Sequence, residues 1–164
     1  MVFRNPREDK VLIKRLVGLP GDKVKVYRGR LFINDVIIKR DPIDDYLYRE
    51  HKKSRNGLRP VTGVDVYSEQ FMGEKTHHQI YEVTDSGQLD DTEEFIVPAG
   101  NVFFMGDNRD RSGDSRTFQV GYVPLTHLIG RAEYMMFSFK RCAKENVNGF
   151  ELRCPERRRF MKKL

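Results

Sequence analysis

The sequence predicts a mainly β protein built from antiparallel sheets. Short apolar and β-branched runs recur along its 164 residues, and turn-forming pairs such as Pro20–Gly21 and Asn34–Asp35 separate them. No stretch keeps its apolar residues at the three- and four-residue spacing of an amphipathic helix. A chain of this length can bury a real core, and it fits one domain, or one domain with a large insertion.

The first 39 residues predict a β-meander. Lys10–Val17 is an apolar, β-branched run, and a Pro-Gly turn in Leu19–Asp22 follows it. Two further runs flank Arg28–Gly29 in the manner of a two-residue hairpin. The predicted elements are a strand ending at Val2–Phe3, a turn at Asn5–Pro6, and strands at Lys10–Val17, Lys23–Tyr27, Arg30–Ile33 and Val36–Lys39.

Residues 40–94 differ in character from the segments on either side. They are rich in Asp, Lys, Arg, Gly and His, with weak strand patterns at Val64–Tyr67 and Gln79–Val83. We therefore predict a β core formed by residues 1–39 and 95–164, with residues 40–94 inserted as a cap subdomain. The strand patterns that follow the insertion are Phe95–Pro98, Asn101–Met105, Val120–Pro124 and Leu128–Phe139.

The composition argues against several classes of protein. No apolar run approaches the roughly 20 residues of a membrane span, and no signal-peptide core is visible. Much of the net charge of +6 belongs to Arg153–Leu164, which we expect to be a frayed basic end. No metal site is predicted, because His77–His78 is an isolated pair without zinc-like spacing to a cysteine. No organic cofactor is implied either. Whether Cys142 and Cys154 form a disulfide stays open.

The densest polar stretch is Gly106–Arg116, which reads GDNRDRSGDSR and directly follows the apolar run Val102–Met105. A strand that enters such a loop places many charged and hydrogen-bonding groups at one sheet edge. Its Gly, Asn and Asp residues allow tight turns, and its Asp and Arg side chains can neutralise one another where water is scarce. Taken alone, this pattern fits a solvated charged loop as well as a functional one.

A second unusual feature is Lys14, inside the apolar strand Lys10–Val17. Strand alternation places it on the same face as Leu12 and Leu16. It could be a snorkelling lysine with a covered stem and a hydrated ammonium group. Alternatively, burial could lower its pKa until the neutral amine takes the proton of a serine hydroxyl as a general base. Ser112 could then supply the hydroxyl that orients the amine.

Long motifs at both ends of the predicted core carry a family resemblance. KRLVGLPGD (Lys14–Asp22), GDNRDRSGDSR and GYVPLTHLIGRA (Gly121–Ala132) are similar to bacterial type I signal peptidases. These are membrane-anchored serine proteases that remove signal peptides from exported proteins by a Ser/Lys dyad. The resemblance extends from Val2 to about Phe139, and the insertion is the part that varies in such enzymes. It implies a coiled, partly open, barrel-like core of antiparallel sheets, a fold shared with LexA-like repressors.

The resemblance also implies roles for single residues. Lys14 matches the general base, and Ser112 matches the hydroxyl that hydrogen-bonds to this lysine and orients it. Four charged residues of the loop match its supporting network, in which the last two form an ion pair: Asp107, Arg109, Asp114 and Arg116.

Five apolar residues match the substrate-binding region of the family. Leu12 and Ile13 match the strand beside which the substrate lies extended. With Val2 and Phe3, they would line shallow pockets for small residues at the −1 and −3 positions of the cleavage site. Phe104, together with Phe3 and Leu12, matches the apolar wall around the lysine.

One motif of the family is missing from this sequence. The nucleophilic serine of type I signal peptidases belongs to a Ser-Met-x-Pro motif after a transmembrane anchor, and no serine here precedes a methionine. The opening Met1–Pro6 falls where the resemblance implies the interior of a strand. We therefore expect this chain to be an N-terminally truncated piece of a longer protein, either shortened on purpose or read from a start codon placed too far downstream. Alone, it should have no peptidase activity.

The resemblance implies partners and a location for the full-length protein. The partners are the signal peptides of preproteins and a membrane surface, and nucleic acid is not expected. The location is the bacterial inner membrane, with the catalytic domain on its periplasmic side.

Three alternatives remain open. A processing peptidase of the conjugative-transfer type would use the same Ser/Lys chemistry on one dedicated substrate. A self-cleaving repressor protease fits less well, because its loop lacks the GDNRDxSxDSR signature. A basic β module that binds nucleic acid would need aromatic residues interleaved with Lys and Arg on an exposed sheet face. Here Phe103, Phe104, Phe137 and Phe139 lie in apolar runs typical of a core.

Overall fold

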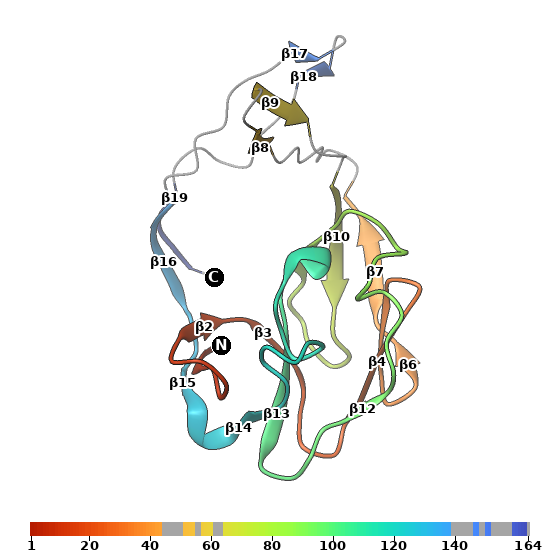
Figure 1. Ribbon diagram of the computed structural model, residues 1–164, viewed down its shortest axis with the longest axis vertical. Helices are drawn as coiled ribbons and strands as arrows, with labels where there is room; N and C mark the ends of the chain where they lie inside the picture. The colour runs from red at the N-terminus through yellow and green to blue at the C-terminus, as the bar shows by residue number, and fades with distance from the viewer. Residues whose placement is uncertain are drawn as a thin grey trace.

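The computed structural model describes residues 1–43, 51–54, 57–60, 64–138, 146–147, 150–151 and 159–163. Within these residues the elements are strands and two short 3-10 helices, so the prediction of a mainly β protein is confirmed. The strands pair antiparallel in several small sheets, none of which closes into a barrel. Figure 1 shows these sheets along the chain.

Two three-stranded sheets share the N-terminal segment. In the first, β1 lies between β15 and β2, and in the second, β13 lies between β14 and β3. The sequence predicts one strand over Lys10–Val17, but the structure divides it at Lys14, because β2 pairs with β1 whereas β3 pairs with β13. The bounds are β1 Val2–Arg4, β2 Val11–Ile13, β3 Arg15–Gly18, β13 Asn101–Met105, β14 Val123–Pro124 and β15 Leu128–Gly130.

A four-stranded sheet contains the predicted hairpins, in the order β12-β4-β5-β6. Arg28 and Gly29 turn the chain between β4 and β5 with φ values of 48° and 68°. Asn34 and Asp35 do the same between β5 and β6, with φ values of 51° and 65°. Positive φ at both central residues gives a turn whose twist suits a tight hairpin. The bounds are β4 Lys23–Tyr27, β5 Arg30–Ile33, β6 Val36–Ile37 and β12 Phe95–Ile96.

The predicted insertion contributes most of a third three-stranded sheet, in the order β11-β10-β7. Its strands are β7 Lys39–Pro42, β10 Asp65–Gln70 and β11 His78–Glu82. The β10–β11 hairpin contacts the 3-10 helix η1, Arg109–Arg111. In Figure 1 the helical turn that follows β13 lies beside β10. The division into a core and a cap subdomain stays a prediction.

The remaining strands form two-stranded pairs: β8 with β9, β16 with β19, and β17 with β18. Their bounds are β8 His51–Ser54, β9 Gly57–Pro60, β16 Tyr134–Ser138, β17 Asn146–Val147, β18 Phe150–Glu151 and β19 Arg159–Lys163, and the second 3-10 helix is η2 Leu125–His127. The prediction of one strand over Leu128–Phe139 is wrong, because β15 pairs with β1 and β16 with β19. The prediction of a frayed tail is also wrong for residues 159–163, which form β19.

Two apolar clusters form the core within the described residues. One gathers around Phe103 and the β4–β5 hairpin, and the other surrounds Phe3 and Phe104. The rings of Phe3 and Phe104 stack with their centroids 4.3 Å apart and their planes 7° apart. The second cluster comprises Phe3, Val102, Phe104, Val120 and Val123, and we call it the Phe3 cluster. Leu12 and Leu16, on either side of Lys14 in the sequence, pack against it.

Candidate functional site

Lys14 lies at the point where the chain leaves one sheet and enters another. Its backbone N–H donates to the carbonyl of Met1 at 3.0 Å. Its own carbonyl accepts from the Met1 amine at 2.7 Å. The leucines predicted to share its face, Leu12 and Leu16, pack against the Phe3 cluster. The backbone of Lys14 is therefore fixed on both sides, and its neighbours on one face are apolar.

The side chain of Lys14 reaches a residue far along the sequence. Its Nζ donates a hydrogen bond to Ser112 Oγ at 2.7 Å, across 98 residues of chain. Ser112 caps the C-terminal end of η1 and is only 6% exposed. A lysine and a buried hydroxyl held at this distance form the pair predicted from the sequence.

Gly106 leaves the space that the Ser112 side chain occupies. A Cβ on Gly106 would lie 2.0 Å from Ser112 Oγ and 2.4 Å from Ser112 Cβ, both far inside van der Waals contact. The same Cβ would approach Lys14 Nζ to 3.5 Å. A side chain at residue 106 would therefore push the hydroxyl away from the lysine.

Asp114 is the centre of the hydrogen bonds inside the Gly106–Arg116 loop. Its side chain is fully buried and forms an ion pair with Arg116, with Nη2–Oδ2 at 2.8 Å and Nε–Oδ1 at 3.0 Å. Asp114 Oδ2 also accepts the N–H of Gly106 at 2.9 Å, and Arg116 Nη2 donates to the carbonyl of Arg109 at 2.6 Å. One buried ion pair thus joins the beginning, middle and end of the loop around Ser112.

The other two charged residues of the predicted network bind different partners. Asp107 forms a bidentate ion pair with Arg15, the residue after Lys14, at 2.7 and 2.9 Å. Arg109 is buried and forms a bidentate ion pair with Glu69 of β10. The sequence places Asp107 and Arg109 in one network, whereas in the structure Asp107 binds to β3 and Arg109 to β10.

Glu69 and His78 are site neighbours that the sequence did not single out. His78 Nε2 lies 2.9 Å from Glu69 Oε2, and both side chains are buried. Burial disfavours the charged form of Glu69, but the hydrogen bond from His78 and the charge and hydrogen bonds of Arg109 outweigh it. They lower the pKa of Glu69 to about 2. No local pattern marks Glu69, because a charged residue in a weak strand usually faces solvent.

The five residues predicted to bind substrate lie at different depths. Val2 and Ile13 are directly paired between β1 and β2, and Ile13 is 59% exposed. Phe3 pairs with Leu12 in the same register, but Phe3 and Phe104 are fully buried in the core. Ile13 therefore exposes its side chain to solvent, whereas the two phenylalanines do not. Their assignment to substrate binding stays a prediction.

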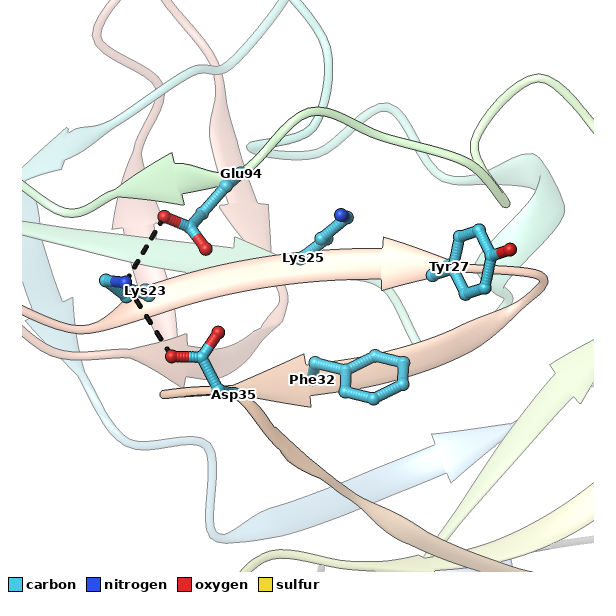
Figure 2. Close-up of a pocket in the computed structure, with 6 residues that line it drawn as sticks. All are labelled: Lys23, Lys25, Tyr27, Phe32, Asp35 and Glu94. Atoms are coloured by element: carbon cyan, nitrogen blue, oxygen red, sulfur yellow. Dashed lines mark ion pairs between the residues drawn. The ribbon is translucent and has the colours of Figure 1, made fainter.

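An open pocket lies elsewhere, on the sheet that contains β4 and β5. Figure 2 shows Lys23 between the carboxylates of Asp35 and Glu94, at 3.6 Å from each. The pocket is lined by Lys23, Lys25, Tyr27, Phe32, Asp35 and Glu94. None of these residues belongs to the predicted site, so this pocket is separate from the Lys14–Ser112 pair.

The neighbouring residues His77 and His78 bond to different partners. His77 Nδ1 lies 3.3 Å from Ser68 Oγ, whereas His78 bonds to Glu69. Among the described residues, no three His, Cys, Asp or Glu side chains are grouped to hold a metal ion. Cys142 and Cys154 lie outside the described residues. Across the described part of the chain, no helix has the length and apolar character needed to span a membrane.

The comparison with known proteins identifies the family. A family model described as "Signal peptidase, peptidase S26" matches residues 1–137. The chain belongs to this family. Signal peptidase I of Rickettsia canadensis (strain McKiel) is 36% identical over 141 residues, covering 85% of this chain and 51% of the relative. Signal peptidase I of Rickettsia prowazekii (strain Madrid E) is 36% identical over 146 residues, with the same coverage.

The chain thus spans about half the length of the curated relatives it matches. A solved signal peptidase I from Enterococcus faecalis V583 is 27% identical, with 77% of this chain and 86% of that chain covered. Its TM-score of 0.40 is too low to bear on the architecture. Signal peptidase I enzymes of the S26 family are serine proteases and therefore hydrolases.

Proposed function

We propose that this chain carries the general-base half of a Ser/Lys dyad in a type I signal peptidase. The observation that supports this most strongly is the 2.7 Å hydrogen bond from Lys14 Nζ to Ser112 Oγ. Family membership supports peptide hydrolysis as the reaction. The substrates would be preproteins, cut after signal peptides that carry small residues at −1 and −3.

Lys14 would act in its neutral amine form. The hydrogen bond to Ser112 uses one N–H and leaves the nitrogen lone pair free for a second hydroxyl, that of the nucleophilic serine. Lys14 takes the proton of that serine as its oxygen attacks the scissile carbonyl, and then gives the proton to the leaving amine. A water molecule then gives a proton to the same amine as it attacks the acyl-enzyme, and the amine returns this proton to the departing serine oxygen.

The nucleophile itself would come from outside the 164 residues. No serine of this sequence precedes a methionine, and Ser112, the serine bonded to Lys14, matches the orienting hydroxyl of the family motif. The full-length protein would also carry the membrane anchor, with this part on the outer side of the bacterial inner membrane. Exposed Ile13, and Val2 opposite it, would line the pockets for small substrate residues.

A processing peptidase with one dedicated substrate would use the same Lys14–Ser112 geometry. A nucleic-acid module has less support, because Phe103 and Phe104 are fully buried and have no exposed face for a base. The side chains of Phe137 and Phe139 lie outside the described residues.

The test compares the 164-residue chain with a longer protein that includes the upstream segment. Each is incubated with a preprotein that has an Ala-x-Ala cleavage site, and the products are sequenced at their N termini. We expect cleavage after the second alanine by the longer protein only. Cleavage by the 164-residue chain would contradict the external nucleophile, and no cleavage by an intact longer protein would contradict the proposed function.

A further inference from the structure

The inserted β10–β11 hairpin makes a buried contact with the loop that holds Ser112. Arg109, in η1, donates to Glu69 Oε1 through Nη1 at 2.9 Å and to Glu69 Oε2 through Nη2. Glu69 and Arg109 are 1% and 3% exposed. His78 Nε2, from the opposite strand, lies 2.9 Å from Glu69 Oε2. The Arg109 guanidinium is therefore fixed by a carboxylate that is itself fixed by a histidine.

Backbone contacts reinforce this attachment on both sides of Arg109. Tyr81 N–H donates to the carbonyl of Asp107 at 2.8 Å, and Tyr81 forms a parallel bridge with Asn108. Asp110 Oδ2 accepts the backbone N–H groups of Val83 and Thr84, the latter at 3.2 Å. The first half of the loop is thus bound along the edge of β11.

The attachment leads directly to Ser112. Arg109 begins the 3-10 helix η1, and Ser112 is the residue that ends it. The carbonyl of Arg109 also accepts from Arg116 at 2.6 Å, and Arg116 pairs with Asp114. Ser112 therefore lies on a short segment between two fixed points, Arg109 on the hairpin side and Asp114 on the core side.

Stability alone is a weak explanation for this arrangement. Charged groups lose hydration when they are buried, so a buried ion pair is often no more stabilising than apolar residues of the same shape. A bidentate Arg–carboxylate pair does fix the direction of both groups. Displacement of a catalytic group by about 1 Å can reduce turnover by about a hundredfold. We therefore expect the Glu69–Arg109 ion pair to contribute mainly to the position of Ser112 rather than to the stability of the fold.

We infer that Glu69 and His78 are positioning residues, which act through Arg109 to hold the Ser112 hydroxyl against Lys14. The hairpin is then a working part of the hydrolytic site, with Glu69 and His78 acting on Ser112 through Arg109. This inference rests on the proposed function of the Lys14–Ser112 pair.

The experiment uses the full-length enzyme with four substitutions: Lys14→Ala, Glu69→Gln, Arg109→Lys and Glu82→Gln. Glu82 is the matched control, because it is a second buried glutamate of the same hairpin whose ion pair is with Arg40, and Arg109 acts on it only through its charge. Steady-state kcat and KM are measured on an Ala-x-Ala peptide, at a temperature well below the unfolding midpoint of each variant.

We expect kcat to fall about tenfold or more in Glu69→Gln, with KM within about twofold of the wild-type value. Arg109→Lys should behave in the same way, because an ammonium keeps the charge but loses the fork geometry. Glu82→Gln should keep the wild-type kcat. Wild-type kcat in folded Glu69→Gln, or an equal loss in Glu82→Gln, would overturn the inference.

Two further results keep the outcomes separate. If Glu69→Gln does not fold, His78→Gln replaces it, and the loss of one hydrogen bond to Glu69 should lower kcat about three- to tenfold. Wild-type kcat in folded His78→Gln would then overturn the inference. Full activity of Lys14→Ala would refute the proposed dyad itself. Inactive Lys14→Ala together with fully active Glu69→Gln would leave the dyad intact and remove only the positioning role.

Discussion

Arg15 and Asp107 join the strand that carries Lys14 to the loop that carries Ser112. Their bidentate ion pair, at 2.7 and 2.9 Å, connects the residue after Lys14 to the residue after Gly106. This ion pair, one residue away from Lys14 in the sequence, holds the strand and the loop at a fixed spacing. Both side chains are partly exposed, at 32% and 41%, so solvent weakens the contribution of the pair to stability.

Asp107→Asn should therefore impair catalysis more than folding. In the full-length enzyme we expect kcat to fall about tenfold, because the strand and the loop lose a charged contact next to Lys14. The free energy of unfolding should change by about 1 kcal/mol or less. Asp9→Asn, which breaks the exposed Arg4–Asp9 pair, is the control and should change neither quantity. Equal effects of the two substitutions on kcat would contradict this prediction.

Substitution of Lys14 tests the base directly. Lys14→Ala in the full-length enzyme should lower kcat by at least about a hundredfold, because it removes the amine proposed to take the proton. Lys14→Arg should not restore activity, since the guanidinium stays protonated. Peptide turnover is the measurement, with circular dichroism to establish folding. Substantial activity in either folded variant would refute the general-base role.

Gly106→Ala should disturb the site through one methyl group. The added Cβ would lie 2.0 Å from Ser112 Oγ, so the hydroxyl must move away from Lys14. We expect kcat to fall about a hundredfold. Gly130→Ala is the matched control, because a Cβ at Gly130 meets no atom within 4 Å. A Gly106→Ala enzyme with the kcat of the control would show that the contact between Gly106 and Ser112 does not position the hydroxyl.

Glu69 should give the folded chain a specific sensitivity to acid. Its pKa is lowered from 4.5 to about 2, so the folded state favours the carboxylate and its stabilisation is complete above pH 4.5. This stabilisation, on the order of 3 kcal/mol, should disappear as the pH falls from about 4.5 to 2. Protonated Glu69 would no longer be charged opposite Arg109.

Urea unfolding of the wild type and of Glu69→Gln between pH 2 and pH 5 measures this effect. The difference in unfolding free energy between them should be largest near pH 5 and should close as the pH falls, because glutamine does not titrate. A difference that stays constant across this range would contradict the lowered pKa.

Local chemistry explains why most of the β core was predictable. The Arg28–Gly29 and Asn34–Asp35 turns depend on residues that tolerate positive φ, and the runs between them have the alternation of half-buried strands. The Lys14–Ser112 contact was reached through motif resemblance, since 98 residues separate the two side chains. No rule of spacing predicts such a contact.

Two kinds of feature could not be predicted from the sequence, because they depend on residues far away along the chain. The strand over Lys10–Val17 keeps its alternation through Lys14, so the exchange of one neighbouring strand for another leaves no local mark. The same applies after Gly130, where β15 ends. Glu69 and Arg109 lie 40 residues apart, and each alone has the pattern of a solvated charge. Only the folded chain shows that they bury one another.

The cross-strand placement of Glu69 and His78 has a consequence for exchanging parts between signal peptidases. These two residues are directly opposite in β10 and β11, and a slip of one residue would turn Glu69 away from Arg109. A β10–β11 hairpin transplanted from a relative would therefore have to keep the pairing of these two strands in register, whereas many of its other residues could differ. Changes in the length of the 71–77 connection should be tolerated, whereas a single deletion within either strand should separate Glu69 from Arg109.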